Sequence, residues 1–301
     1  MTHGSPSPTP NAQHGSSPRP GGESVCYVYG VVPAAFAPPR PASGIDDTSV
    51  ALERDEARGV AALVSFLGAS DYTPPRLDDR IADVSWLGPR AAAHDLVLTW
   101  ASDRGEVVPF PMFSIFSGID AVRRMLSERA PELVDALARV AGAREYGIRL
   151  YRIDAELLGA VTTLSPRLAV MERAANEASP GQRYLLQRKL EIEKRDEMRV
   201  VGRAIADELW NELRDESRDS VRSPIPRVSS ADAESAARGT MILNAAFLVN
   251  TEGLRPFQSV VTAFAAEHEG RGFRVDFTGP WPPYHFVGGA DGRGSEVGDG
   301  R

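Results

Sequence analysis

The sequence predicts an α+β protein of two domains with disordered tails, and the order of its apolar segments is the main reason. Residues 143–287 read as strand, long helix, strand, strand, helix and strand, which is the βαββαβ order of a ferredoxin-like domain. Residues 25–142 contain a shorter series and are predicted to form an abbreviated ferredoxin-like α+β domain. Residues 1–24 (Pro, Ser and Gly-rich) and 288–301 (Gly-rich) hold too little apolar surface to offset the entropy lost on ordering, so both tails are predicted to be disordered.

The first domain is expected to begin with two strands. Residues 25–32 are β-branched and aromatic for most of their length, which indicates a strand buried on both faces. Residues 33–58 are rich in proline and then in charge, so we expect a loop that leads to a second strand at residues 59–67. Another polar loop is expected after it.

A helix, a strand and a second helical stretch complete the first domain. Pro89 is expected in the first turn of a helix, where its missing N–H costs nothing, and Gly105 is expected to end that helix. The two prolines within residues 107–116 confine this apolar segment to a sheet edge or a bulged strand. Apolar residues then recur at helical spacing over residues 119–140, with a predicted break at Pro131.

The second domain is expected to begin with a strand at residues 145–154, followed by a loop and a long helix over about residues 180–217. Ser179 and Gln182 fit a helix cap and its capping-box partner. The apolar face of this helix is formed by Leu186, Leu190, Met198, Val201, Ile205, Leu209 and Leu213. Seven of the nine residues 191–199 are charged, so the helix is expected to project past the sheet or to bend there.

Three strands and a helix follow. Residues 221–228 predict a short strand interrupted by prolines, and the nearly all-apolar residues 240–250 predict a central strand. Residues 256–269 have one apolar face and predict a helix. The alternation of apolar and polar residues over 273–278 then predicts a half-buried strand.

Composition narrows the classes of partner and compartment. The net charge of −7 leaves no dense cationic surface for nucleic acid or for an anionic membrane. No apolar run approaches the ~20 residues of a membrane helix. The single cysteine, Cys26, cannot form an internal disulfide, and the N-terminus lacks the apolar core of a signal peptide, so we expect a cytoplasmic protein.

We find no motif for catalysis, cofactor binding or metal binding. The phosphate loop, the HExxH zinc helix, the CxxC pair and the GxSxG nucleophile turn are all missing from the sequence. His94 and His285 have no second ligand at a suitable spacing, so we interpret them as hydrogen-bonded structural residues. The carboxylates within residues 191–199 are interpreted as a solvated charged face, with Glu191 and Arg195 paired one turn apart.

Residues 278–287, TGPWPPYHFV, are the most unusual segment. Three prolines are expected to hold it in a polyproline-like geometry that presents three aromatic rings. The rings either pack as a C-terminal lock on the last sheet or form a docking surface for another protein. The candidate interaction residues are Pro280, Trp281, Pro282, Pro283, Tyr284 and Phe286.

Several segments, in order, resemble the gas vesicle F/L (GvpF/GvpL) family. The clearest is GPWPPYHFV directly after an alternating strand, and the others agree in order over essentially residues 25–287. They are the opening strand at 25–32, HDLVLTWASDRGEVVPFPMFSIF at 94–116, EYGIRLY at 145–151, GQRYLLQRKLE at 181–191 and LNAAFLV at 243–249. The stretch PFPMFSIF is more similar to L-type than to F-type members.

The resemblance implies an accessory or minor structural protein of gas vesicle assembly, associated with the vesicle in the cytoplasm. It implies contacts with the small hydrophobic shell protein (GvpA-type) and with other gas vesicle proteins, to nucleate or chaperone the shell, and it implies no enzymatic activity and no cofactor. The alternative is a ferredoxin-like ligand-binding regulator or an enzyme of unknown substrate, because such folds carry many unrelated functions. A sheet edge that accepts a strand of the shell protein is one physical route to the first function.

Overall fold

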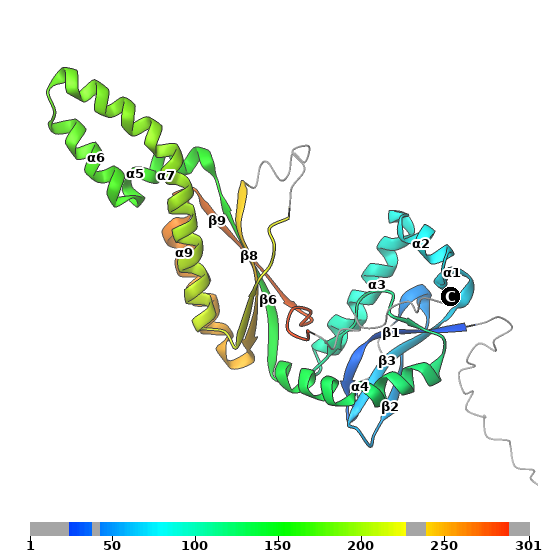
Figure 1. The fold of residues 1–301 in the computed structure, drawn as a ribbon. Helices are drawn as coiled ribbons and strands as arrows, with labels where there is room; N and C mark the ends of the chain where they lie inside the picture. Colours follow the sequence, from blue (N-terminus) through cyan, green and yellow to red (C-terminus); the bar gives the residue numbers. More distant parts are fainter. Residues whose placement is uncertain (1–23, 38–42, 227–238, 289–301) are drawn as a thin grey trace, which may run out of the picture.

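The computed structural model describes residues 24–37, 43–226 and 239–288, which form a mixed α+β structure with two separate sheets (Figure 1). The first sheet and its helices lie at one end of the molecule, the second sheet lies in the middle, and a helical arm extends from the second sheet at the other end. The predicted α+β class is confirmed. Apart from Ser24 and Gly288, the two tails predicted to be disordered lie outside the described residues.

The N-terminal sheet is antiparallel, and its central strands are the most apolar segments of the first half. The strand order is β2-β3-β1-β4, and β5 also pairs with β1. The strands are β1 (Ser24–Pro33), β2 (Ala51–Asp55), β3 (Val60–Gly68), β4 (Val108–Pro109) and β5 (Ile115–Phe116). As predicted, the proline-containing segment lies at an edge, in two short strands, because proline cannot donate a ladder hydrogen bond.

Helices cover both faces of this sheet, because alternate side chains of β1 are buried on opposite sides. Cys26 and Val28 pack in one cluster with α4, whereas Tyr27 and Tyr29 pack in another with α3. The helices are α1 (Ala69–Tyr72), α2 (Arg76–Ile81), α3 (Val84–Ser102) and α4 (Ile119–Val140), with the short 3-10 helix η1 (Ile45–Asp47) before β2. The N-terminal half is therefore a three-layer unit.

The C-terminal sheet is also antiparallel and has the order β7-β8-β6-β9. Its strands are β6 (Ala143–Arg152), β7 (Asp219–Arg222), β8 (Thr240–Asn250) and β9 (Phe273–Trp281). The apolar β8 is central, as predicted. β7 begins two residues earlier than expected, at Asp219, and the end of its predicted range, from residue 227, lies outside the described residues. β9 continues past its predicted end because Trp281 still pairs with Glu145.

The two faces of the C-terminal sheet have different partners. α7 (Pro180–Asp215) and α9 (Leu254–His268), with η2 (Thr251–Gly253) before α9, pack on one face and bury one large apolar cluster. On the other face, Ala246 and Leu248 of β8 belong to the same cluster as Leu133 and Leu137 of α4. The two halves of the chain thus share a core.

The helical arm consists of α5 (Asp154–Leu164), α6 (Pro166–Glu177) and the N-terminal part of α7 (Figure 1). The predicted projection of the long helix past the sheet is visible there. The predicted loop before it is wrong, because α5 and α6 occupy that segment and pack along α7. Both α6 and α7 begin with a Ser-Pro pair. In α6 the serine, Ser165, caps the helix by accepting a hydrogen bond from Leu168 N at 3.2 Å.

Two expectations about prolines within helices are wrong. α3 begins at Val84, where Asp83 caps it by accepting from Ser85 N at 2.9 Å, so Pro89 lies in the second turn instead of the first. α4 runs without a break through Pro131. Its buried side chains on both sides of the proline enter one cluster, and we attribute the continuity to this burial, which offsets the roughly 3 kcal/mol cost of an interior proline.

Short polar elements in the first half were also missed. The predicted loop over residues 33–58 contains β2, whose charged ALERD sequence fits an exposed edge strand better than a buried one. The polar loop expected after the second strand contains α1 and α2. Neither helix is long enough to show an apolar periodicity in the sequence.

Candidate functional site

Residues 278–287, predicted to be either a lock or a docking surface, lie at the junction of the two sheets. Trp281 still belongs to β9, and the chain then turns back on itself. Tyr284 N donates to the Pro282 carbonyl at 2.8 Å and Phe286 N donates to the Pro283 carbonyl at 3.2 Å. The expected polyproline-like geometry is therefore wrong after Trp281, because a polyproline helix has no internal hydrogen bonds.

The six candidate residues of this segment divide into two groups. Pro282, Pro283 and Phe286 are buried, whereas Pro280, Trp281 and Tyr284 are exposed. The exposed fraction is 49% for Trp281 and 38% for Tyr284, which is high for aromatic side chains. Burial of the first group is what a C-terminal lock requires. The second group leaves aromatic surface that another molecule can contact.

Contacts from this segment reach both halves of the chain. Phe286 and Val287 lie in the cluster formed with α4 and the N-terminal sheet. Arg139 of α4 donates to the Phe286 carbonyl at 3.2 Å, and the Tyr284 hydroxyl donates to Asp95 of α3 at 3.3 Å. The segment therefore holds the N-terminal unit against the C-terminal sheet.

A buried carboxylate fixes the turn. Glu145 of β6 accepts two hydrogen bonds, from His285 N at 2.9 Å and from the His285 ring Nδ1 at 2.7 Å. The Glu145 carboxylate raises the pKa of His285, although partial burial of the ring opposes this. His285 is thus a hydrogen-bonded structural residue, as the sequence indicated.

Gly279 is required at an irregularity within β9, between Thr278 and Trp281. Its φ of +117° lies in a region that residues with a side chain rarely adopt, and a Cβ there would lie 2.9 Å from the Glu145 carbonyl oxygen. The glycine lets β9 pass close to β6 immediately before the exposed Trp281.

His94 is the second candidate histidine, and it is buried between α3 and β1. Its Nδ1 lies 2.7 Å from the Tyr27 hydroxyl, and burial lowers its pKa to about 4. Within the part of the chain that the structure describes, its Nε2 has no hydrogen-bond partner. The ring is therefore neutral at pH 7 and closed off from solvent, which suits a structural residue and not a proton donor to a substrate.

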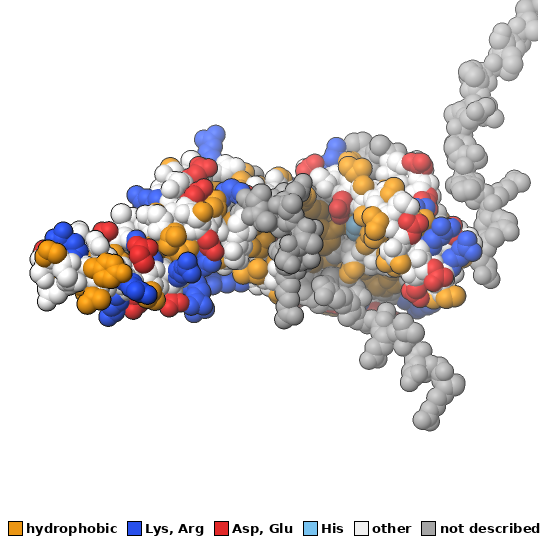
Figure 2. Space-filling view, turned by 90° about the horizontal axis from the view of Figure 1, so that it is seen from above, with side chains coloured by type: hydrophobic (Ala, Val, Ile, Leu, Met, Phe, Trp, Pro, Cys, Tyr) orange, Lys and Arg blue, Asp and Glu red, His pale blue; other side chains and the backbone are white. Residues whose placement is uncertain are grey.

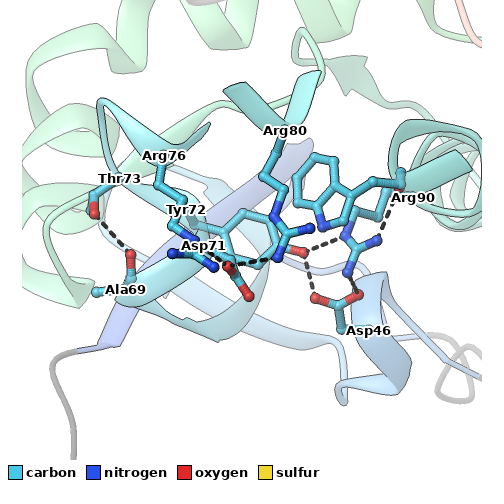
Figure 3. Close-up of polar contacts among 9 residues, drawn as sticks. Asp46, Ala69, Asp71, Tyr72, Thr73, Arg76, Arg80 and Arg90 are labelled. Carbon is cyan, nitrogen blue, oxygen red and sulfur yellow. Dashed lines mark hydrogen bonds and ion pairs between the residues drawn. The ribbon is translucent and has the colours of Figure 1, made fainter. Parts of the chain in front are cut away.

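A polar cluster on the N-terminal unit was not predicted (Figure 3). Asp46, at a φ of +51°, accepts from the Tyr72 hydroxyl and pairs with Arg90 at 2.6 Å. Arg90 also donates to the Tyr72 hydroxyl at 2.9 Å and lies 4.1 Å from the ring centre of Trp86. These groups satisfy one another and connect η1, α1 and α3, so we interpret the cluster as a structural clamp.

The arm carries the largest set of exposed apolar side chains, and sequence reasoning missed it. Figure 2 shows hydrophobic side chains beside Lys and Arg at the end of the molecule that the arm forms. The exposed large apolar side chains on α6 and α7 are Val170, Tyr184, Leu185, Ile192 and Val200. The signal was available, because Leu185 and Ile192 are spaced seven residues apart, outside the stripe that packs on the sheet.

The charged stretch of α7 is only partly the solvated face that we expected. Glu197 is buried and accepts from Ser165 at 2.7 Å and from Arg167 at 2.8 Å, so it joins α6 to α7. Glu191 pairs with Lys194 at 2.6 Å instead of with Arg195. Glu197 therefore stabilises the arm, whereas the exposed Glu191 contributes little.

Residues 24–37, 43–226 and 239–288 contain neither a cluster of metal-ligating side chains nor a membrane-spanning helix. No group of three His, Cys, Asp or Glu side chains in these ranges is arranged to hold a metal ion. No helix in these ranges combines the length and apolarity needed to cross a bilayer.

The known proteins that resemble this chain are gas vesicle proteins. A family model described as gas vesicle synthesis protein GvpL/GvpF matches residues 25–288. Gas vesicle protein L of a Streptomyces species is 31% identical over 263 residues, covering 87% of this chain and 92% of that protein. Gas vesicle protein L2 of Halobacterium salinarum is 29% identical over 267 residues, covering 87% of this chain and 90% of that protein. Both relatives are L proteins, in agreement with the L-type features of the sequence.

The fold has also been seen in a solved structure. The crystal structure of gas vesicle protein GvpF from an Anabaena species superposes with a TM-score of 0.61, covering 88% of this chain and 98% of that one. Because the two sequences are 19% identical, this likeness speaks for the fold alone.

Proposed function

Because this chain belongs to the gas vesicle synthesis protein GvpL/GvpF family, we propose that it is an accessory or minor structural protein of gas vesicle assembly. In this proposal it binds the small hydrophobic shell protein (GvpA-type) and other gas vesicle proteins in the cytoplasm, and so nucleates or chaperones the shell. The protein works through its surfaces, without catalysis, cofactor, nucleic acid or membrane.

We also propose that the chain divides into two domains, at residues 25–142 and 143–287. The strand order β7-β8-β6-β9 with α7 and α9 on one face supports a ferredoxin-like assignment for the second domain. The first would be its abbreviated relative. In that arrangement β9 is an edge strand.

The observation that carries the proposed function is the exposed Trp281 at the end of the edge strand β9. Within the described part of the chain, β9 pairs with β6 alone, so its other edge has backbone groups free to accept a strand. Tryptophan is enriched among the residues that dominate protein interfaces, and Tyr284 adds a second exposed ring nearby in the sequence. Together they offer an apolar contact to a hydrophobic partner.

The test is co-purification of the shell protein with the wild-type chain and with Trp281→Ala. We expect the substitution to reduce the amount of bound shell protein about tenfold or more, because truncation of an interface tryptophan removes roughly 2 kcal/mol or more of binding free energy. We expect the melting temperature to change little, since Trp281 is half exposed.

Phe66→Ala is the matched control for this test. Phe66 has nearly the same exposed fraction, 48% against 49%, but it lies on β3 of the N-terminal sheet. Equal loss of binding in both variants would contradict a specific role for Trp281. A large drop in the melting temperature of Trp281→Ala would mean that the ring serves as a lock.

A further inference from the structure

Four arginine side chains from three elements line one hollow beside the base of the arm. They are Arg152 of β6, Arg199 and Arg203 of α7, and Arg222 of β7. The hollow has a volume of about 440 Å³, and Asp207 is the one acidic side chain among the described residues that line it. The hollow is thus locally basic although the chain has a net charge of −7.

Two of these arginines are held in place. Arg152 pairs with Asp154 at 2.6 Å and is largely buried. Gly202 leaves room for it, because a Cβ at that position would lie 3.3 Å from Arg152 Cδ. Arg222 pairs with Asp207 at 2.8 Å, and its guanidinium lies 4.7 Å from the ring centre of Trp210.

The other two are open to an incoming anion. Arg203 is exposed and makes no hydrogen bond or ion pair with any residue that the structure describes. Arg199 pairs with Asp196, but the two side chains are 72% and 68% exposed, and solvated pairs of this kind contribute little to stability. Exchange of Asp196 for a ligand oxygen would therefore cost little.

We infer that this hollow binds the phosphate monoester group of a small organic compound. A guanidinium presents a planar fork of donors that matches phosphate oxygens, and a phosphate dianion carries more charge than the carboxylates with which these arginines already pair. Ile225, Met241 and Ile242 form an apolar wall for the body of the ligand.

The hollow is separate from the proposed shell-protein contact. Arg152 is the last residue of β6, whereas Trp281 pairs with Glu145 near the beginning of that strand. Seven residues of extended chain separate the two positions, which corresponds to roughly 23 Å. Failure of one proposal therefore leaves the other standing.

The test is a calorimetric titration of the full chain with phenyl phosphate at low salt. We expect saturable binding that Arg203→Ala weakens about tenfold or more, because a hydrogen bond to a charged group is lost. Arg188→Ala, an exposed arginine of the same helix nearer the tip of the arm, is the matched control and should change the affinity by less than about twofold. The melting temperatures of both variants verify that they fold.

Two further anions define the ligand class. Benzenesulfonate has the same ring with one negative charge, and inorganic phosphate has the charge without the ring, so both should bind more weakly than phenyl phosphate. The inference is overturned if phenyl phosphate does not bind saturably, if Arg203→Ala binds it as well as the wild type, or if either of the other anions binds equally well.

Discussion

At the residue scale, the two structural histidines have opposite electrostatic surroundings. Glu145 raises the pKa of His285, whereas burial lowers the pKa of His94 to about 4. A raised pKa stabilises the fold below the unfolded value of about 6.5, and that stability is lost as the pH rises through the folded value. His94 has a lowered pKa, so its pH dependence runs the other way: the fold loses stability as the pH falls from about 6.5 towards 4.

The His285 contribution can be isolated by comparison of the wild type with His285→Ala. The difference in the free energy of unfolding between them should be larger at about pH 5.5 than at about pH 8.5, because only the protonated ring forms an ion pair with Glu145. His94 is present in both proteins, so its own titration cancels. Denaturant unfolding at the two pH values measures the effect, and a difference that does not vary with pH would refute it.

Some residue roles could be predicted from the sequence and others could not. The types and positions of Trp281 and Tyr284 marked them as candidates, but the sequence could not say that they are exposed while Phe286 is buried. The Glu145 and His285 pair joins positions 140 residues apart, and nothing local indicates it. Long-range contacts of this kind depend on the register of β6 with β9.

At the element scale, the helices differ in how strongly their ends are marked. The start of α7 was predicted because Ser179 and Pro180 precede a long apolar stripe. α6 begins with the same Ser-Pro pair but has only 12 residues against the 36 of α7, so its apolar pattern is short and it was missed together with α5. The predicted cap and capping box at Ser179 and Gln182 are wrong, because the Ser179 hydroxyl bonds the Gln182 side chain at 2.9 Å and caps no backbone N–H.

This difference predicts unequal effects of two similar substitutions. Ser165→Ala should lower the free energy of unfolding by about 1–2 kcal/mol, because it removes the α6 cap and a hydrogen bond to the buried Glu197. Ser179→Ala should cost less than about 0.5 kcal/mol, since its exposed hydroxyl satisfies no backbone group. Denaturant unfolding of both variants measures the two changes. Equal losses of unfolding free energy would show that the α6 cap adds no stability of its own.

At the scale of the whole molecule, the shared core makes the C-terminal segment part of the N-terminal fold. Phe286 is 3% exposed and packs in the cluster that includes α4 and β1. Phe286→Ala should therefore lower the free energy of unfolding by about 3–5 kcal/mol. It should also uncouple the two halves, so that their thermal transitions separate in calorimetry.

Trp281→Ala provides the comparison for this substitution, because it truncates an exposed ring of the same segment. A Phe286→Ala protein that melts in one transition at the temperature of Trp281→Ala would contradict the coupling. The overall class and the order of strands in the second half could be predicted from the sequence. The coupling of the two halves could not, because an apolar residue type does not identify the residues that it packs against.

The arm gives the molecule a long, stiff spacer. α7 has 36 residues, which corresponds to about 54 Å of helix, and α5 and α6 brace the part that leaves the sheet. Under the proposed function, a shell subunit bound at Trp281 would therefore be held apart from any partner bound at the exposed apolar side chains of α6 and α7.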